Sequence, residues 1–310
     1  MRDLLDRDLR HLFVLAHFDD DLGYGGLLSR LSGSVDVVYL TNGDGIAPEV
    51  GADPAEYAAM RTAESRVALG AAGIGGERLR HLGYSEIEIY DRLVDVTACP
   101  GEFGAIAAYF RRMAGVVAAE VDRVRPDVLW TCAYQQGHPE HDLAHVMAAT
   151  ALRARRPGAT LCGLPQYELT ILVPLRFPPW RREGVQAVEL TPAEVDVKRR
   201  MRDAYPSQAK LFRSFERVIN GIGLVGRLAG RGFDFDGYVS RETYAVVPPR
   251  FDYLTPAYAL DPLNYMFERH RGIKVSFQHH LRPVVAALLA GGIRPVIAAD
   301  HGGADGLEAL

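Results

Sequence analysis

Short apolar runs alternate with longer segments of helical periodicity through the first half of the chain. The apolar runs have the length and composition of buried strands, and they lie at residues 12–16, 35–40, 79–84 and 127–131. Segments 54–72 and 103–124 have helical periodicity, and Pro126 ends the second of them. One short helix joins the first two runs, which favours a parallel β-α-β unit. This order predicts an α/β protein with a Rossmann-like, doubly wound and mostly parallel sheet.

The last third of the chain predicts fewer regular elements. The expected elements are a strand at 166–173, a helix at 191–201 that begins with Thr191 as cap and Pro192 in its first turn, a loop at 220–237, and a helix at 283–290 before a frayed end. We expect two parts, a core at residues 1–215 and a C-terminal extension at residues 216–310 that packs on the core and contributes to its pocket.

The composition argues against several classes of partner. With 48% hydrophobic and 24% charged residues the chain can bury a full core, and its net charge of -4 provides no basic field for nucleic acid or an anionic membrane. No apolar run approaches the roughly 18 residues of a membrane span, and the N-terminus has no apolar signal segment. Cys99, Cys132 and Cys162 form no C-x-x-C pair. We expect a cytoplasmic protein that binds a small molecule, and the sequence leaves a homo-oligomer open.

Two polar clusters stand directly after predicted strands, at residues 16–21 and 137–142. Each places imidazole and carboxylate groups where a strand ends, which is where open α/β sheets bind ligands. His17 and Asp20 from the first cluster and His141 from the second predict a three-ligand metal site. Three protein ligands leave a fourth position for water, which is typical of catalytic zinc, and iron and cobalt suit the same donors.

Two further residues of these clusters predict the chemistry of the site. Asp19 adjoins a predicted ligand and would take a proton from water as general base. His138 would act as a cation that stabilises an oxyanion, or as the acid for the leaving group. The pattern therefore indicates metal-assisted hydrolysis of an acyl derivative.

Other interpretations of the same residues stay open. A run of aspartates after a strand is often a solvated turn with a helix cap. His141 and His145 lie four residues apart and form a rival ligand pair, which ranks second because no Glu directly follows His141. The glycines at 23, 25 and 26 lack the G-x-G-x-x-G spacing of a dinucleotide site.

The clusters resemble the motifs of the LmbE/PIG-L family of zinc-dependent deacetylases. The family's A-H-P-D-D-E motif with a following glycine pair stands here as Ala16-His17-Phe18-Asp19-Asp20-Asp21 with Gly25-Gly26, and its H-P-D-H motif stands as His138-Pro139-Glu140-His141. Its R-x-x-E pattern is matched by Arg61 and Glu64, and its K…A-x-Y-x-S-Q segment is similar to residues 198–208. The similarity covers the chain from residue 10 to residue 215.

The resemblance implies a role for each matching residue. It implies that the three predicted ligands bind zinc and that Asp19 is the general base. It implies that His138 is the positively charged partner of the oxyanion and that Glu140 orients or stabilises that charge. Arg61 would reach the hydroxyl groups of a sugar substrate.

Four positions depart from the family pattern. Phe18 stands in place of Pro and predicts either a wall of the substrate pocket or plain packing. Asp21 is one methylene shorter than the family's Glu, and Glu140 is one methylene longer than its Asp. Some members have a Tyr before the Gly of the second motif that polarises the amide carbonyl, whereas this chain has Gln136 there and Tyr134 two residues earlier. We expect Gln136 to contact the substrate from this position. These changes leave the ligands intact and indicate an unusual substrate.

The resemblance predicts a zinc-dependent hydrolase that removes an N-acyl group, with N-acetyl the expected group, from an amino sugar such as N-acetylglucosamine or from a glycosylated small molecule of specialised metabolism. The alternatives are an amidase that acts on a thiol conjugate or another non-sugar amide, and a catalytically inactive sugar- or nucleotide-binding module. Aromatic residues of the C-terminal third predict either core packing or a larger apolar acceptor site, and they are Trp180, Phe233, Phe235, Tyr238, Tyr253 and Tyr258.

Overall fold

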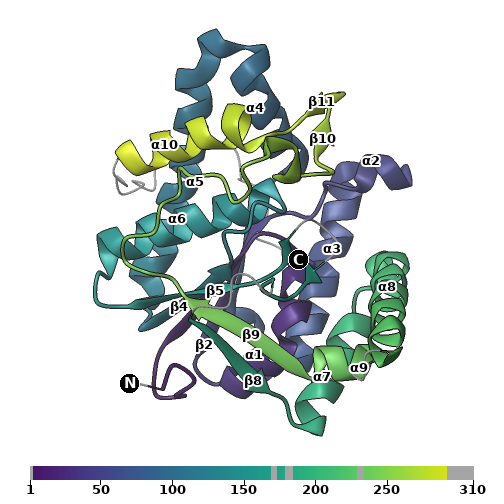
Figure 1. Ribbon diagram of the computed structural model, residues 1–310. Coiled ribbons are helices and arrows are strands. Elements are labelled where there is room, and N and C mark those ends of the chain that lie inside the picture. Colours follow the sequence, from purple (N-terminus) through teal and green to yellow (C-terminus); the bar gives the residue numbers. More distant parts are fainter. Residues whose placement is uncertain (1–2, 169–172, 179–183, 229–233, 292–310) are drawn as a thin grey trace.

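The computed structural model describes residues 3–168, 173–178, 184–228 and 234–291, which fold around one central sheet (Figure 1). In this part of the chain the sheet has seven strands in the order β3-β2-β1-β4-β5-β9-β8. The strands are β1 (His11–Leu15), β2 (Val35–Thr41), β3 (Leu79–Tyr84), β4 (Val128–Cys132), β5 (Thr160–Leu164), β8 (Val185–Glu189) and β9 (Arg241–Val246). β1 pairs in parallel with β2 and β4, whereas β9 pairs antiparallel with β5 and β8. The predicted α/β fold with a mostly parallel, doubly wound sheet is confirmed.

Helices cover both faces of this sheet. The helices are α1 (Gly25–Leu31), α2 (Ala47–Val50), α3 (Pro54–Ala71), α4 (Glu86–Ala98), α5 (Phe103–Val124), α6 (Pro139–Arg155), α7 (Pro192–Asp203), α8 (Ala209–Leu228), α9 (Phe235–Val239) and α10 (Arg282–Ala290). α1 and α3 pack against α7 on one side, and α5, α6 and α10 pack together on the other (Figure 1). Because both faces are covered, the central strands are near-continuous apolar runs.

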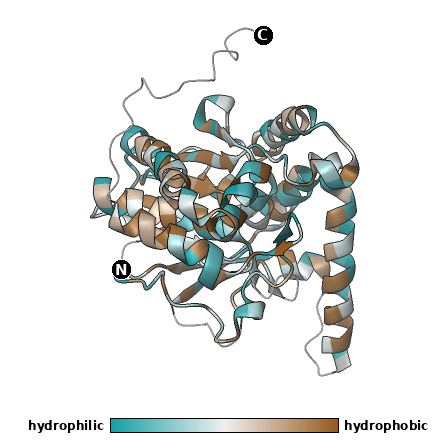
Figure 2. Ribbon diagram, turned by 90° about the horizontal axis from the view of Figure 1, so that it is seen from above, coloured by the Kyte–Doolittle hydropathy of each residue, from teal (hydrophilic) through white to brown (hydrophobic). Residues whose placement is uncertain are grey.

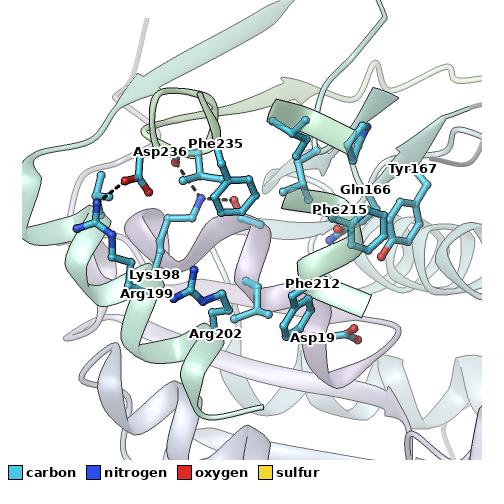
Figure 3. Close-up of a pocket in the computed structure, with 17 residues that line it drawn as sticks. Asp19, Gln166, Tyr167, Lys198, Arg199, Arg202, Phe212, Phe215, Phe235 and Asp236 are labelled. Carbon is cyan, nitrogen blue, oxygen red and sulfur yellow. Dashed lines mark hydrogen bonds and ion pairs between the residues drawn. The ribbon is translucent and has the colours of Figure 1, made fainter. Parts of the chain in front are cut away.

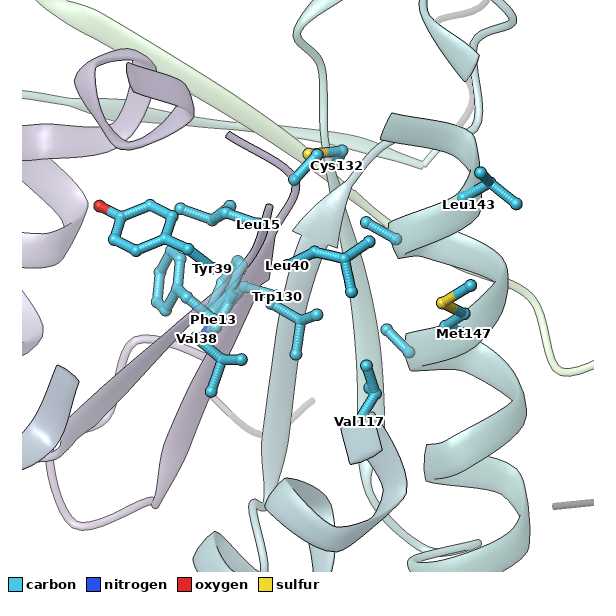
Figure 4. Packing of buried hydrophobic residues seen from close by; sticks show 14 of the residues in the cluster. Phe13, Leu15, Val38, Tyr39, Leu40, Val117, Trp130, Cys132, Leu143 and Met147 are labelled. Atoms are coloured by element: carbon cyan, nitrogen blue, oxygen red, sulfur yellow. The ribbon is translucent and has the colours of Figure 1, made fainter. Parts of the chain in front are cut away.

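The core lies between the sheet and the helices. Figure 4 shows Leu143 and Met147 of α6 pointing toward the strands, with Val117 of α5 beside them. These side chains have no exposed surface. Across β1 and β4, Phe13 stacks on Trp130 with ring centroids 5.6 Å apart. This packing gives the C-terminal ends of β1 and β4 a rigid position.

Several predicted element bounds are present in the structure. α5 covers the predicted segment 103–124, and α7 begins as predicted, with Pro192 as its first residue. Thr191 accepts a hydrogen bond from the backbone N–H of Glu194, and the Glu194 side chain accepts one from the backbone of Thr191. This reciprocal pair satisfies two backbone donors at the start of the helix.

The loop predicted at residues 220–237 was wrong at 220–228 and at 235–237, and its residues 229–233 lie outside the described part. α8 continues to Leu228, and α9 covers Phe235–Val239. Three glycines at 221, 223 and 226 lower helix propensity in this segment. Apolar residues at helical spacing nevertheless make α8 amphipathic; Ile219 is 3% exposed, whereas Leu224 and Val225 are 62% and 67% exposed. Figure 2 shows α8 as a long helix at one side of the molecule.

The single strand predicted at residues 166–173 was also wrong. Two short strands, β6 (Tyr167–Glu168) and β7 (Val173–Pro174), pair antiparallel in this region, and residues 169–172 lie outside the described part. A second small pair is formed by β10 (Arg269–His270) and β11 (Ile273–Lys274). The end predicted to fray after α10 also lies outside the described residues.

The C-terminal part of the chain contributes to the central sheet. The predicted boundary at residue 215 falls within α8. β9, from the predicted extension, lies between β5 and β8, and α10 packs on α5 and α6. Residues on both sides of the boundary therefore share one sheet. Within the described ranges, no helix combines the length and the apolar character needed to cross a bilayer.

Candidate active site

Two loops bring the histidine and carboxylate groups to one edge of the sheet. The chain leaves β1 toward β2 on one side and leaves β4 toward β5 on the other, so the strand order reverses between β1 and β4. Doubly wound sheets bind ligands outside the C-terminal ends of the strands at this point. His17 follows β1 and caps the 3₁₀ helix at Phe18–Tyr24, and His138 follows β4 and caps α6. Both predicted clusters thus lie at the ligand-binding edge.

The three predicted metal ligands converge. His17 Nδ1 lies 3.1 Å from His141 Nε2 and 3.7 Å from Asp20 Oδ1. His141 Nε2 lies 2.9 Å from Asp20 Oδ1. Donor atoms that bind one zinc tetrahedrally at about 2.0–2.2 Å are about 3.3–3.6 Å from one another. The observed separations of 2.9, 3.1 and 3.7 Å lie on both sides of this range, so shifts of a few tenths of an ångström would let the three atoms share one metal ion.

Buried groups behind the ligands hold them in place. Glu140, only 1% exposed, accepts a hydrogen bond from His17 Nε2 at 2.8 Å, so the Nδ1 atom of that ring keeps its lone pair for the cluster. Asp20 Oδ2 accepts hydrogen bonds from the backbone N–H groups of Ala16 and His17 at 3.0 and 2.9 Å. A carboxylate behind a metal-binding histidine is a common outer-shell arrangement. Glu140 therefore holds His17 directly, whereas its oxygen lies 3.7 Å from His138.

The charges around the cluster favour a cation. Burial would lower the pKa of His17, but nearby carboxylates, with Glu86 foremost and Asp20 next, raise it well above 6.5. Burial would raise the pKa of Asp20, but the imidazoles of His141 and His17 hold it well below its usual range. The carboxylates of Glu86, Asp20 and Glu140 thus surround the imidazole rings of His17 and His141. Their negative charge stabilises a cation between these rings.

Other donor atoms adjoin this set. Ligand atoms of His17, His138 and His141 lie within 4.8 Å of one another, and so do those of Asp20, Cys132 and His141. Cys132 donates its thiol to Asp20 Oδ2 at 3.4 Å, and burial raises the pKa of this thiol well above 9. A protonated thiol is a poor metal ligand. This argues against Cys132 as a ligand, and the predicted set of His17, Asp20 and His141 stays a prediction beside the neighbouring donor His138.

His138 lies beside the cluster and contacts two distant segments. Its Nε2 atom is 3.3 Å from the hydroxyl of Tyr90, which donates a hydrogen bond to Glu268. Its Nδ1 atom is buried and makes no hydrogen bond within the described residues. Burial lowers the pKa of His138 to about 4, so the ring is neutral at pH 7 in this arrangement. The positive charge predicted for His138 stays a prediction.

Asp19 and Arg61 form an ion pair at the entrance to the cluster. Asp19 Oδ1 lies 3.2 Å from Arg61 Nη2, and 16% of the Asp19 side chain is exposed. Arg61 is buried, contacts Glu64, and packs over the ring of Tyr205 at 5.2 Å. Arg61 therefore orients Asp19, and its predicted contact with a sugar stays a prediction.

Phe18 and Asp21 are both directed into the protein. Phe18 has no exposed surface and meets the rings of Tyr39 and His81 edge-on at 5.1 Å, which is a packing role. The shorter Asp21 side chain accepts hydrogen bonds from Tyr39 at 2.6 Å and from Tyr205 at 3.0 Å. Burial raises the pKa of Asp21 to about 8. Two tyrosine hydroxyls thus meet the carboxylate that replaces the family's Glu.

Gln136 holds the C-terminal part of the chain. Its side-chain amide donates to the carbonyl of Thr255 at 3.2 Å and accepts from the backbone N–H of Ala257 at 2.8 Å. Tyr134 donates to the carbonyl of Tyr253 at 2.9 Å. Both side chains are engaged away from the cluster, and the predicted contact of Gln136 with substrate stays a prediction.

His145 does not join His141. Its Nδ1 atom lies 2.6 Å from the carbonyl of Cys132, and its Nε2 atom lies 3.3 Å from the hydroxyl of Tyr253. Both ring nitrogens are therefore engaged, and burial lowers the pKa of His145 to about 4. The rival His141/His145 ligand pair is not formed.

The segment at residues 198–208 makes hydrogen bonds to the loop of the first cluster and to α3. Lys198 donates to the carbonyl of Gly23 at 2.9 Å and forms an ion pair with Glu242 at 2.8 Å. Ser207 binds the Glu64 carboxylate through its backbone N–H and its hydroxyl. The segment thus fixes both the aspartate loop and the helix that carries Arg61.

The sequence analysis missed Glu86, Tyr90 and Glu268. Glu86 follows the strand at 79–84, so the argument about polar residues at strand ends would have found it. Tyr90 lies one turn further along α4, and Glu268 lies in a loop before β10. The sequence has no signal that these two segments meet His138.

The fold and the site together define an α/β protein with a histidine and carboxylate centre at the switch point of its sheet. Residues 12–152, which include both clusters, match the sequence model of the PIG-L family, described as GlcNAc-PI de-N-acetylase. The predicted resemblance to this family is therefore confirmed over residues 12–152, which is somewhat less than half of the chain. The description of this family names an enzyme that removes an acetyl group from an amide nitrogen.

Solved structures share the fold at low sequence identity. A deacetylase from the biosynthesis pathway of teicoplanin is 17% identical with a TM-score of 0.56, over 76% of this chain and 97% of that one. The N,N'-diacetylchitobiose deacetylase from Pyrococcus horikoshii is 17% identical with a TM-score of 0.50, over 78% and 85% of the two chains. A 4-carboxy-2-hydroxymuconate hydratase from Pseudomonas putida is also 17% identical, with a TM-score of 0.51, over 79% and 98%. A search of curated proteins found no significant match.

Proposed function

We propose that the protein is a zinc-dependent hydrolase that removes an N-acyl group, with N-acetyl the expected group, from an amino sugar or a glycosylated small molecule. The observation that carries the proposal is the convergence of His17, Asp20 and His141 beside Asp19 at the switch point of the sheet. The neighbours named as teicoplanin and diacetylchitobiose deacetylases support a sugar-type amide.

The residues of the site divide the chemistry among them. Zinc held by the three ligands would polarise the acyl carbonyl and lower the pKa of a water molecule, and iron or cobalt would suit the same donors. Asp19, oriented by Arg61, accepts a proton as the water oxygen bonds to the acyl carbon. His138, charged as the resemblance implies, would donate a ring N–H to the oxyanion. The C–N bond then breaks, and the proton on Asp19 passes to the departing amine.

Metal content and amine release test this proposal together. The wild-type protein should contain about one zinc per chain and release free amine from a panel of N-acetylated amino sugars. His141→Ala should lose both properties. Asp19→Asn should keep the metal and lose amine release about 10²–10⁴-fold, whereas Asp122→Asn, an exposed control, should keep both. Failure of the wild type to bind metal after reconstitution would overturn the proposal.

The same panel separates the alternatives. Preferred cleavage of a thiol conjugate or another non-sugar amide over amino sugars would identify an amidase with the same centre. Sugar or nucleotide affinity without turnover, in a protein that retains no metal, would identify a binding module. If the protein is instead a hydratase, like one of the solved structures with this fold, it will add water to a carbon–carbon double bond and release no amine.

A further inference from the structure

A cavity adjoins the proposed general base and is not explained by an acetyl group. Its empty volume is about 800 Å³, part of it open to solvent. Figure 3 shows Asp19 at one end beside Phe212, and Phe235 toward the other end. An acetyl group has only two carbon atoms, so it would fill a small part of this space.

Apolar side chains from four segments form most of the wall. They are Leu22 after the aspartate loop, Leu175 after β7, Val195 of α7, and Phe212, Phe215 and Ile219 of α8. The three residues of α8 are spaced by three and four positions, so they share one face of the helix. Ile219 is 3% exposed, and Phe212 packs, partly buried, against the core.

The cations in the wall are already paired. Lys198 Nζ lies 2.8 Å from Glu242, Arg199 lies 2.8 Å from Asp236, and Arg202 lies 2.9 Å from Asp203. A site built for an anionic ligand would present unpaired cations or backbone N–H groups. The cavity therefore offers apolar contact rather than anion recognition.

The cavity reaches residues that adjoin the catalytic cluster, namely Asp19 and Tyr167. Tyr167 lines it and stacks on the ring of His141, with centroids 5.3 Å apart. Tyr167 also stacks on Phe215 of α8 at 6.0 Å. These two rings therefore connect the wall of the cavity to His141 of the cluster.

We propose that this cavity binds an extended apolar part of the substrate, an alkyl chain or an aromatic group, attached next to the amide that the enzyme hydrolyses. The proposal rests on the proposed deacylase function for the position of the amide. The apolar part belongs either to the acyl group or to the aglycone of the amine, and both present the same chemistry to the wall. It is recognised by burial of its surface between α7, α8 and the β6–β7 hairpin.

Two substrate series test the proposal and identify the side of the amide. One series is N-acylglucosamine with acyl chains from two to ten carbons, and the other is N-acetylglucosamine with alkyl aglycones from one to eight carbons. In one of them kcat/KM should rise about threefold to fourfold for each methylene until the cavity is full. Flat profiles in both series, with measurable turnover, would overturn the proposal and leave the deacylase function intact.

Adjacent residues of α8 provide a matched pair of variants. Ile219 is 3% exposed and lines the cavity, whereas Val218 is 38% exposed and does not. Ile219→Trp should abolish the rise with chain length and leave the shortest substrate within about twofold of wild type, whereas Val218→Trp should keep the rise. Val195→Phe, which fills the cavity from α7, should repeat the effect of Ile219→Trp if that variant does not fold. An equal loss of activity for short and long substrates would contradict the proposal.

Binding measured without catalysis separates the two proposals. The apolar fluorescent probe N-phenyl-1-naphthylamine should bind the wild type and Val218→Trp, and Ile219→Trp should weaken this binding about tenfold or more. Probe binding with no turnover of either series would overturn the deacylase function and keep the apolar site. No probe binding by the wild type would overturn the apolar site.

Discussion

Glu140 has a closer partner than the one expected from the motif. The resemblance implied that it orients His138, but its carboxylate is hydrogen-bonded to His17 at 2.8 Å and lies 3.7 Å from His138. The extra methylene of Glu relative to the family's Asp provides the additional reach. This places Glu140 behind a proposed metal ligand.

Glu140→Gln should therefore weaken metal binding. The neutral amide no longer stabilises the His17 ring electrostatically, and loss of such an outer-shell carboxylate lowers metal affinity about 10- to 100-fold. Competition with a chromophoric chelator measures this change. Glu268→Gln is the matched control, because Glu268 contacts Tyr90 and His138 rather than His17. Equal metal affinity of Glu140→Gln and wild type would contradict the assignment of His17.

Gly137 stands at a position where the structure leaves no room for a side chain. A Cβ atom at this position would lie 2.2 Å from the carbonyl oxygen of Tyr167, which is backbone and has little freedom to move. Gly137→Ala should lower the free energy of unfolding by about 1–3 kcal/mol and displace the neighbouring His138. Urea unfolding measures the first effect. Gly33→Ala, where a Cβ meets nothing within 4 Å, should show no comparable loss.

At the level of elements, a buried ion pair joins α1, α7 and β9. Glu242 of β9 accepts hydrogen bonds from the backbone N–H groups of Gly26 and Leu27, near the start of α1, and from Lys198 of α7. Glu242 is 2% exposed and Lys198 is 7% exposed. The glycine pair of the first motif is needed here, because a Cβ on Gly26 would lie 2.5 Å from Leu190. The motif thus brings α1 close to the α7 region.

Glu242→Gln should destabilise the protein by about 3–5 kcal/mol, because it leaves the Lys198 ammonium buried without a counter-charge. Urea unfolding measures the change, with Glu189→Gln as an exposed control. Adding Lys198→Met to Glu242→Gln should recover part of the loss. If the double variant is no more stable than Glu242→Gln alone, the unpaired ammonium is not the cause.

Most elements of the first half follow from local pattern. The runs at 35–40 and 79–84 and the helix at 103–124 are present because their periodicity matches the element that buries them. The prediction failed at α8, where three glycines obscure the helical spacing of the apolar residues. The sequence analysis also did not predict β8 and β9, because the antiparallel pairing of segments far apart in the chain leaves no pattern in the local sequence.

For the molecule as a whole, the central sheet depends on the C-terminal part of the chain. A chain that ends after residue 215 loses β9, which leaves the edge of β5 open and β8 without a partner. We expect this truncated chain to aggregate or to unfold without a cooperative transition. Size-exclusion chromatography and thermal melting followed by circular dichroism measure this. Co-expression of residues 216–310 should restore a soluble complex, and a stable, cooperative 1–215 chain would show that the sheet tolerates the loss of β9.

The amino-acid sequence alone was enough to place His17, Asp20 and His141 at one edge of a parallel sheet. Strands that run parallel end on the same side, so polar residues directly after β1 and β4 must meet there. The tertiary structure decided the partners of the other site residues. Arg61 binds Asp19, Gln136 binds the segment at 255–257, and Tyr90 with Glu268 reaches His138. These contacts join segments far apart in the chain, and such contacts depend on how whole elements pack rather than on local spacing.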